Sequence, residues 1–244
     1  MLNDLGRTEE AASYYQKALS INPDFPFAHC NMGGIHLLQE ENHAALTSFK
    51  RALELRPDYG EALIGLSKTF LALERPHNAK AAAFRASQLE PNNIAVHALL
   101  GRVHTELAEP EQAESCFNHA LVLDPSNDDA LQGLAHLCLE NGQMEKAGEL
   151  FGRAIELNSN NLSARAQLAQ AQKKITAEDS NFIALQAAEQ KIADYPAGIA
   201  ITLHYALGKC YDDVGEYAKA FPHFLAGSKL KRATLTYDHD LIAK

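Results

Sequence analysis

The chain repeats one pattern of small, aromatic and proline residues every 34 positions, and this period restricts its fold more than any other feature. Alanines form one column of the repeat: Ala45, Ala79, Ala113 and Ala147. Prolines form another column, near the end of each copy: Pro57, Pro91 and Pro125. A period of about 20–50 residues is the signature of a stacked array, because one unit alone cannot bury its apolar face. The sequence therefore predicts a stack of similar units.

Each copy is predicted to form two helices, at about positions 1–14 and 17–30 when Pro26 is counted as position 1. Position 8 is always small, which suits two helices that cross closely: Gly33, Ser67, Gly101, Ala135, Ala169 and Gly208. Position 24 mostly carries a phenylalanine that fills the space between neighbouring copies: Phe49, Phe117, Phe151 and Phe224, with Ala83 as the exception. Leucines at position 7 add the apolar stripe of the first helix. Proline at position 32 cannot continue a helix and sets the turn into the next copy.

The chain resembles the tetratricopeptide repeat family in its small residues at positions 8, 20 and 27, its aromatic residue at position 24 and its proline at position 32. This resemblance covers nearly the whole chain. It implies an all-α fold, in which helix hairpins stack into a right-handed superhelical solenoid with a concave face lined mainly by the first helices. Arrays of this family usually hold other proteins, so the resemblance implies a binding scaffold.

We expect one solenoid over residues 1–244. Its expected parts are a partial repeat, four regular repeats, an irregular repeat, a last repeat, and a tail or the start of a linker: 1–25; 26–59, 60–93, 94–127 and 128–161; 162–200; 201–234; and 235–244. Because the chain begins inside a repeat, the helix of about residues 8–20 lacks its first-helix partner and exposes apolar surface. This end is therefore a candidate for self-association, unless another element covers it.

The irregular repeat loses the register of the array. A polar insertion at Thr176–Asn181 separates its two expected helices, and the apolar pattern resumes two to three residues late. We predict a distorted repeat, with a second helix over about residues 179–194 and a last copy that begins near Ile201.

The C-terminal part of the chain carries a second resemblance. Roughly residues 175–244 resemble the segment that precedes the sulfotransferase domain in bacterial fusions of tetratricopeptide repeats with a sulfotransferase. The residues that carry it lie in Leu207–Asp213, Gly215–Phe221 and Gly227–Arg232. This resemblance implies a bacterial protein in which a catalytic domain follows Lys244, while nothing in the chain itself contains that domain.

The net charge argues against two classes of partner, and the cysteines predict the compartment. The chain has 22 Lys and Arg against 31 Asp and Glu, a net charge of −9, and it has no polybasic run. Binding to phosphates requires clustered basic residues, so we expect neither a nucleic-acid partner nor a membrane partner. The 4 cysteines form no C-x-x-C pair, which predicts reduced thiols and a cytoplasmic location.

The sequence contains no motif for catalysis. It has no G-x-x-x-x-G-K-[ST] phosphate loop, no G-x-G-x-x-G after a strand and no G-x-S-x-G nucleophile elbow. We therefore predict that this chain is not an enzyme and uses no cofactor.

His29, His36 and His43 are spaced by seven residues, which separates them by about 10 Å along a helix, too far to share one metal ion. We expect His36 and its counterpart His104 to pack between helices, and we expect no metal site.

The first helices carry the candidate binding residues. Side chains at positions 2, 5, 6, 9, 12 and 13 are expected to line the concave face. Position 9 forms a column of hydrogen-bond donors: Lys68, Arg102, His136, Gln170 and Lys209. Stacking separates neighbouring members by roughly 10 Å, which favours a groove for an extended peptide with carboxylates or exposed carbonyls. The alternative is that these residues are solvated polar positions.

The N-terminal part of the expected groove is largely apolar at Phe27, Ile64 and Leu71. Such a patch marks a binding site, unless the missing first helix covers it. Asn31 alone matches the asparagine ladder of the O-linked N-acetylglucosamine transferase array, which argues against backbone clamping of that type.

We predict a non-catalytic scaffold that binds a protein or peptide. The alternatives are an arm that positions a substrate or partner for a larger enzyme, and an oligomerisation module.

Overall fold

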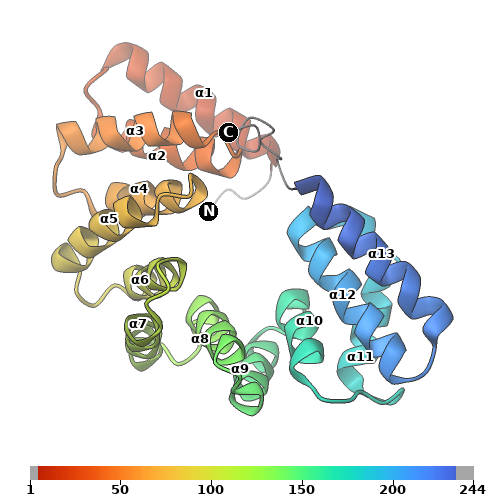
Figure 1. Cartoon of the computed structure of the whole chain (residues 1–244). Helices are drawn as coiled ribbons and strands as arrows, with labels where there is room; N and C mark the ends of the chain where they lie inside the picture. Colours follow the sequence, from red (N-terminus) through yellow and green to blue (C-terminus); the bar gives the residue numbers. More distant parts are fainter. Residues whose placement is uncertain (1–4, 235–244) are drawn as a thin grey trace, which may run out of the picture. The chain divides into compact units, whose positions relative to one another are not determined.

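The computed structural model describes residues 5–234, and these residues form helices joined by short connections (Figure 1). Within this range there are thirteen α-helices, one short 3-10 helix and no strand. The α-helices are α1 (Leu5–Ile21), α2 (Pro26–Leu38), α3 (Asn42–Leu55), α4 (Gly60–Ala72), α5 (Pro76–Leu89), α6 (Ile94–Glu106), α7 (Pro110–Leu123), α8 (Asp128–Glu140), α9 (Met144–Leu157), α10 (Leu162–Ala171), α11 (Ser180–Glu189), α12 (Ala197–Asp213) and α13 (Tyr217–Thr234). The predicted all-α fold is confirmed. The tail or linker predicted at 235–244 lies outside the described residues.

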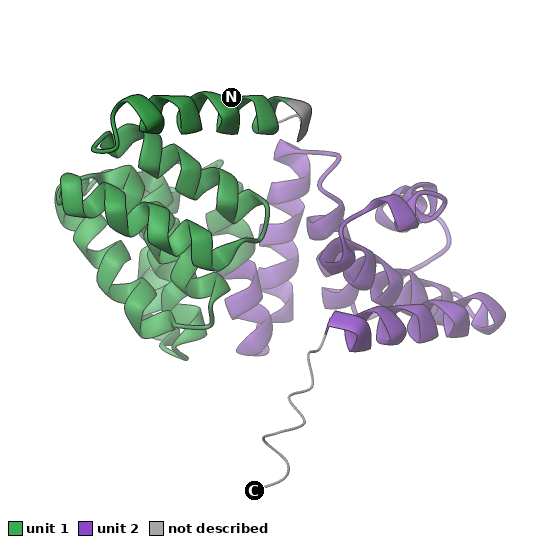
Figure 2. Cartoon of the chain, turned by 90° about the horizontal axis from the view of Figure 1, so that it is seen from above, with its two compact units in different colours: residues 1–133 green, residues 134–244 purple. Residues whose placement is uncertain are grey.

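The chain divides into two compact units, Met1–Gly133 and Leu134–Lys244 (Figure 2). Unit 1 contains α1 to α7 and the start of α8, and unit 2 contains the rest of α8 together with α9 to α13. A single continuous solenoid over the whole chain stays a prediction.

Unit 1 consists of helix hairpins whose register agrees with the sequence prediction. α2, α4 and α6 begin at position 1 of their repeats, and α3, α5 and α7 begin at position 17. The turn inside each hairpin places position 15 in the left-handed region, at Glu40 (φ 60°), Glu74 (φ 56°) and Ala108 (φ 54°). α5 and α7 begin with proline, which lacks only an N–H that the first turn of a helix leaves unpaired. α4 and α6 each pack against the second helix of their own hairpin and against that of the preceding one.

A phenylalanine held between two glycines fixes the spacing of neighbouring hairpins in unit 1. A Cβ atom added at Gly65 would lie 2.3 Å from Cε1 of Phe49, and one added at Gly33 would lie 2.9 Å from the same ring. Phe117 has the same relation to Gly101 and Gly133, with added Cβ atoms at 2.5 and 2.4 Å from its ring. Where position 24 is instead Ala83, the following helix carries Leu99 at the place of the second glycine, and both are buried. Volume at one position is thus compensated at the other, as a close-packed interior requires.

The described side chains of α1 are less buried than their counterparts in the next repeat, as predicted. α1 contacts α2, but none of its described side chains is fully buried. Ala11, Tyr15 and Ala18 are half-buried, whereas Ala45, Phe49 and Ala52 at the same positions of the next repeat are at most 3% exposed. Tyr14 and Ile21 are 61% and 86% exposed. This end of unit 1 therefore presents apolar surface.

Unit 2 contains the distorted repeat that the polar insertion predicts. α10 ends at Ala171, and an irregular segment leads to α11. The second helix is shorter than the predicted span 179–194, because α11 ends at Glu189 and only a 3-10 turn, Ile192–Asp194, follows. The last repeat begins earlier than predicted, since α12 starts at Ala197, directly after the helix-breaking Pro196.

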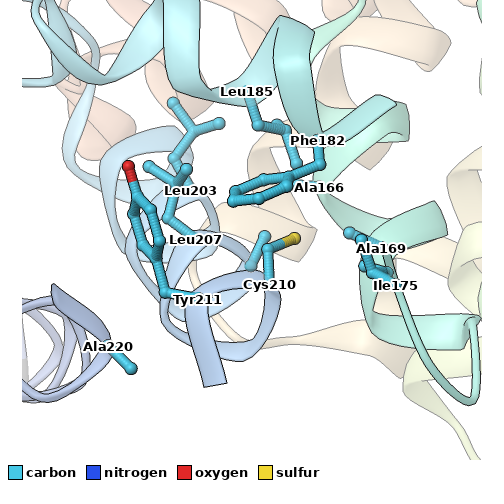
Figure 3. Packing of buried hydrophobic residues seen from close by; sticks show 11 residues of the cluster. Ala166, Ala169, Ile175, Phe182, Leu185, Leu203, Leu207, Cys210, Tyr211 and Ala220 are labelled. Carbon is cyan, nitrogen blue, oxygen red and sulfur yellow. The ribbon is translucent and has the colours of Figure 1, made fainter. Parts of the chain in front are cut away.

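A separate apolar cluster holds the distorted repeat together (Figure 3). Ile175 is 1% exposed, so the irregular segment is anchored by its own apolar side chain. The backbone N–H of Ile175 donates to the Asp213 carboxylate of α12 at 3.0 Å. Phe182 of α11 meets the Tyr211 ring of α12 edge-on, with centroids 5.3 Å apart. These contacts replace the regular hairpin packing that the insertion prevents.

Candidate functional site

The first helices of unit 1 form its inner face. α2 contacts α4 directly, and α4 contacts α6, although a second helix lies between each pair in the sequence. At position 9 of these helices, Lys68 and Arg102 are exposed. The third residue at this position is Gly34, where an added Cβ would meet no atom within 4 Å. The inner face therefore presents two cationic side chains on adjacent helices.

A cleft of about 620 Å³ brings Lys68 and Arg102 together. Leu71 and Ala72 from the last turn of α4 and Pro76 from the start of α5 add apolar walls. Glu74, held in the left-handed region at the turn, and Glu106, the last residue of α6, bring carboxylates to the same cleft. Helix ends and one hairpin turn thus converge on a single site.

The charges of this cleft have no ion-pair partners within residues 5–234. Lys68, Arg102, Glu74 and Glu106 are all exposed, and none of them forms a salt bridge in the described part of the chain. A guanidinium and an ammonium on neighbouring helices can hold one carboxylate, and the guanidinium can do so through two parallel hydrogen bonds. The flanking carboxylates can accept hydrogen bonds from a cation or an N–H group.

The other members of the predicted column lie in unit 2, and two of them have partners there. His136 meets the Phe151 ring edge-on at 5.7 Å between centroids, and burial lowers the pKa of its imidazole despite the nearby Glu140. Lys209 forms an ion pair with Asp213 at 2.5 Å, whose carboxylate also anchors Ile175. Gln170 is exposed. His136 and Lys209 therefore contribute to the packing of unit 2.

The predicted apolar residues are only partly available. Phe27 is 48% exposed, and its ring contacts Tyr15 at 6.1 Å between centroids. Ile64 and Leu71 are half-buried against the core of unit 1, and Leu71 also lines the cleft. The Asn31 amide donates to the Phe27 carbonyl within its own helix at 2.8 Å, so one of its polar groups is already used.

The sequence did not single out Glu74, Pro76 and Glu106 as site residues. Glu106 occupies position 13, which the helical pattern places on the inner face, so a signal for it existed. Glu74 belongs to the hairpin turn and Pro76 begins the helix that follows it, so the direction of both side chains depends on the left-handed φ of 56° at Glu74. Helical periodicity carries no information about such a turn.

Two histidines at position 11 pair with glutamates that follow the hairpin turns. His36 Nδ1 lies 2.6 Å from Glu41 Oε2, and His104 Nδ1 lies 2.5 Å from Glu109 Oε2. The Glu109 carboxylate also accepts from Lys80 at 2.7 Å, and these two partners lower its pKa. His104 is 8% exposed, which agrees with the predicted packing between helices. Among residues 5–234, no group of three possible metal-ligating side chains lies close enough to hold an ion.

The cysteines are free, and three of the four are buried. Burial raises the pKa of Cys30 to about 11 and that of Cys210 to about 12. Both thiols therefore stay protonated at neutral pH, which makes them poor nucleophiles. Their role is in packing.

Family models identify the repeats. A model described as "Tetratricopeptide repeat" matches residues 36–103 and 109–173, and one described as "TPR repeat" matches residues 1–40. These matches cover more than half of the chain, so the chain belongs to the tetratricopeptide repeat family. A comparison with curated proteins gives no match.

Solved structures show the same fold. A thermophilic TPR protein of Thermus thermophilus, TTC0263, is 26% identical with a TM-score of 0.61, over 68% of this chain and 91% of that one. Cut9, from the APC/C hetero-tetramer Cut9–Hcn1, is 17% identical with a TM-score of 0.72, over 94% of this chain and 46% of that one. MamA of Desulfovibrio magneticus is 22% identical with a TM-score of 0.56, over 64% and 88%.

The helices leave no candidate for a membrane span. Across residues 5–234, none has both the length and the apolar character that crossing a bilayer requires.

Proposed function

We propose that this chain is a protein-binding scaffold that holds an extended segment of another protein on the inner face of unit 1. The observation that supports this proposal is the cleft in which Lys68 and Arg102 converge without ion-pair partners in the described chain. An exposed cation in a protein of net charge −9 has many carboxylates nearby in sequence, yet these two remain unpaired within residues 5–234. The tetratricopeptide fold favours the same class of function.

The chemistry of the cleft favours a segment with one acidic side chain beside an apolar one. Arg102 and Lys68 hold the carboxylate, and Leu71 contacts the apolar side chain. Glu74 and Glu106 repel further negative charge, so a polyacidic segment binds less well than one with a single acid. Glu74 and Glu106 also accept hydrogen bonds from backbone N–H groups of the segment.

The test is selection from a display library of random octapeptides on the immobilised full chain. We expect enrichment of peptides with one Asp or Glu next to a large apolar residue. The dissociation constant of a selected, fluorescein-labelled peptide is then measured by fluorescence anisotropy. The double variant Lys68→Ala/Arg102→Ala is expected to weaken binding about tenfold or more, since each charge-assisted hydrogen bond contributes about 1.5–3 kcal/mol.

The matched control is Lys17→Ala/Lys50→Ala, which removes two exposed positive charges from second helices of unit 1. It changes the net charge by the same amount, so equal weakening by both double variants would show a general charge effect. That result, or selected peptides without acidic residues, would contradict the proposed site.

Self-association through α1 is a second candidate, favoured by the exposed apolar side chains Tyr14 and Ile21. Light scattering over a range of protein concentrations tests it, with Tyr14→Glu/Ile21→Glu as the variant that restores a monomer. A concentration-independent monomeric mass for the unmodified chain would rule it out.

We also propose a cytoplasmic location in a bacterium, supported by the four free cysteines and by the resemblance of residues 175–244 to bacterial fusion proteins. The same resemblance supports the alternative that the chain is the partner-positioning arm of a sulfotransferase. The coding sequence beyond Lys244 decides this, because a phosphosulfate-binding strand, loop and helix would follow in a fusion. Fractionation of the source cells tests the location.

A further inference from the structure

Unit 2 contains a cleft of about 840 Å³ that the proposed function does not use. It lies between the start of α9 and the end of α10, and residues from these helix ends and the adjoining turns line it: Gly142, Met144, Gly148, Ala171, Gln172 and Lys173. All of these residues belong to unit 2, so the cleft is formed within that unit alone.

The cleft exists because the last turn of a first helix is missing. α10 has 10 residues, whereas α4, α6 and α8 each have 13. Position 11 carries a buried side chain in most other repeats, as at Phe70 and Cys138, but in this repeat it is the half-buried Gln172, just beyond the helix. Gly148 lacks a side chain on the facing helix, and a Cβ there would meet only Leu168, at 3.7 Å. Volume that side chains fill elsewhere in the array is open here.

The walls combine apolar surface with an incompletely bonded amide. Met144 is 46% exposed, and its flexible thioether side chain adapts to differently shaped apolar groups. The Gln172 amide donates to Asp179 over a long 3.4 Å, and its oxygen is buried without a donor in the described chain. A buried acceptor without a partner costs about 1–3 kcal/mol. Rotation of this weakly held amide toward an N–H group in the cleft would recover that energy.

The charge of the cleft opposes that of the chain as a whole. Its lining includes Lys146 and Lys173 but only the one carboxylate of Glu145, in a chain of net charge −9. Lys173 is exposed and forms no salt bridge within residues 5–234. An acidic ligand therefore complements the cleft.

We propose that this cleft is a second peptide-binding site, which accepts one large apolar side chain followed by an acidic residue. The apolar side chain lies against Met144 and Ala171, in the space left open at Gly148. The carboxylate of the next residue pairs with Lys173, and a backbone N–H donates to Gln172 Oε1. This site belongs to unit 2 and is independent of Lys68 and Arg102.

Methionine methyl NMR tests the proposal directly. The chain has 3 methionines, Met1, Met32 and Met144, so the Met144 signal of the ¹³C-methyl-labelled full chain is assigned with one Met144→Leu variant. The probe is the tetrapeptide Ac-Ser-Leu-Asp-Ser-NH₂, compared with Ac-Ser-Gly-Asp-Ser-NH₂ and Ac-Ser-Leu-Asn-Ser-NH₂. We expect a saturable shift of Met144 with the first peptide and binding at least about tenfold weaker for the peptide without the leucine.

Gly148→Leu fills the cleft and is expected to abolish the shift, while Gly148→Ala is the matched control that keeps most of the space. Lys173→Ala is expected to weaken binding severalfold and to remove the preference for Asp over Asn. Circular dichroism checks that these variants stay folded, and Lys68→Ala/Arg102→Ala is expected to leave the Met144 response unchanged.

Three results would overturn the proposal. They are an unshifted Met144 at millimolar peptide, equal shifts with all three peptides, and an unchanged response in both Gly148→Leu and Lys173→Ala. A Met144 shift that depends on protein concentration without peptide would instead identify a second copy of the chain as the occupant.

Discussion

Gly65→Ala tests the packing rule that spaces the hairpins of unit 1. The added Cβ would lie 2.3 Å from two atoms of the Phe49 ring, well inside contact distance. The ring has little room on its other side, because Gly33 packs so closely there that even an added Cβ would lie only 2.9 Å from it. Overpacking of this kind costs about 1–3 kcal/mol in free energy of unfolding. Relief of the clash would require the backbone of α4 to shift.

Alanine also gains helix propensity over glycine, by about 1 kcal/mol, which offsets part of this cost. The matched control is Gly34→Ala on α2, where the new Cβ meets no atom within 4 Å and only the propensity gain remains. We therefore expect the two variants to differ by about 1–3 kcal/mol in free energy of unfolding, with Gly65→Ala the less stable.

Urea denaturation of the full chain, followed by far-UV circular dichroism, measures this difference through the transition midpoint at constant slope. Adding Phe49→Leu is expected to recover part of the loss in Gly65→Ala, which a double-mutant cycle reports as an interaction energy. Equal midpoints for Gly65→Ala and Gly34→Ala would refute the packing rule.

Two further predictions concern unit 2. Burial lowers the pKa of His136, and burial and then the adjacent His223 lower that of His204. Below about pH 6.5 these histidines therefore bind protons in the unfolded chain before they do so in the folded chain. The urea midpoint should fall from pH 7 to pH 5 and stay level above pH 7. A midpoint that rises on acidification would contradict the lowered pKa values. Asp213→Asn should cost about 1–3 kcal/mol in urea denaturation, and Lys209→Ala less, since Asp213 also anchors the irregular segment; equal losses would contradict that anchor.

Much of the helix register in unit 1 follows from the sequence, because small residues and prolines recur at the same positions of each copy. Phe49 and Phe117 at position 24 each pack against a glycine on both neighbouring helices, and a proline at position 32 follows each second helix of unit 1. The irregular segment before α11 follows no such rule. Its course depends on Ile175 and Asp213, which lie 38 residues apart and meet only in the folded chain.

The candidate site was predictable only in part, for a related reason. Lys68 and Arg102 share one column of the repeat, so their approach on adjacent helices follows from the stacking. His136 and Lys209 share that column, but Phe151 and Asp213 engage them. Whether a column residue is available depends on its neighbours, which differ from repeat to repeat.

Charge reversal at the inner face of unit 1 tests whether Lys68 and Arg102 bind an acidic peptide. Anisotropy gives the dissociation constants of a selected acidic peptide, and of its counterpart with lysine in place of the acid, for the unmodified chain and for Lys68→Glu/Arg102→Glu. We expect charge reversal to weaken binding of the acidic peptide about tenfold or more and to strengthen binding of the lysine peptide. Unchanged affinities for both peptides in the reversed variant would contradict binding at this cleft.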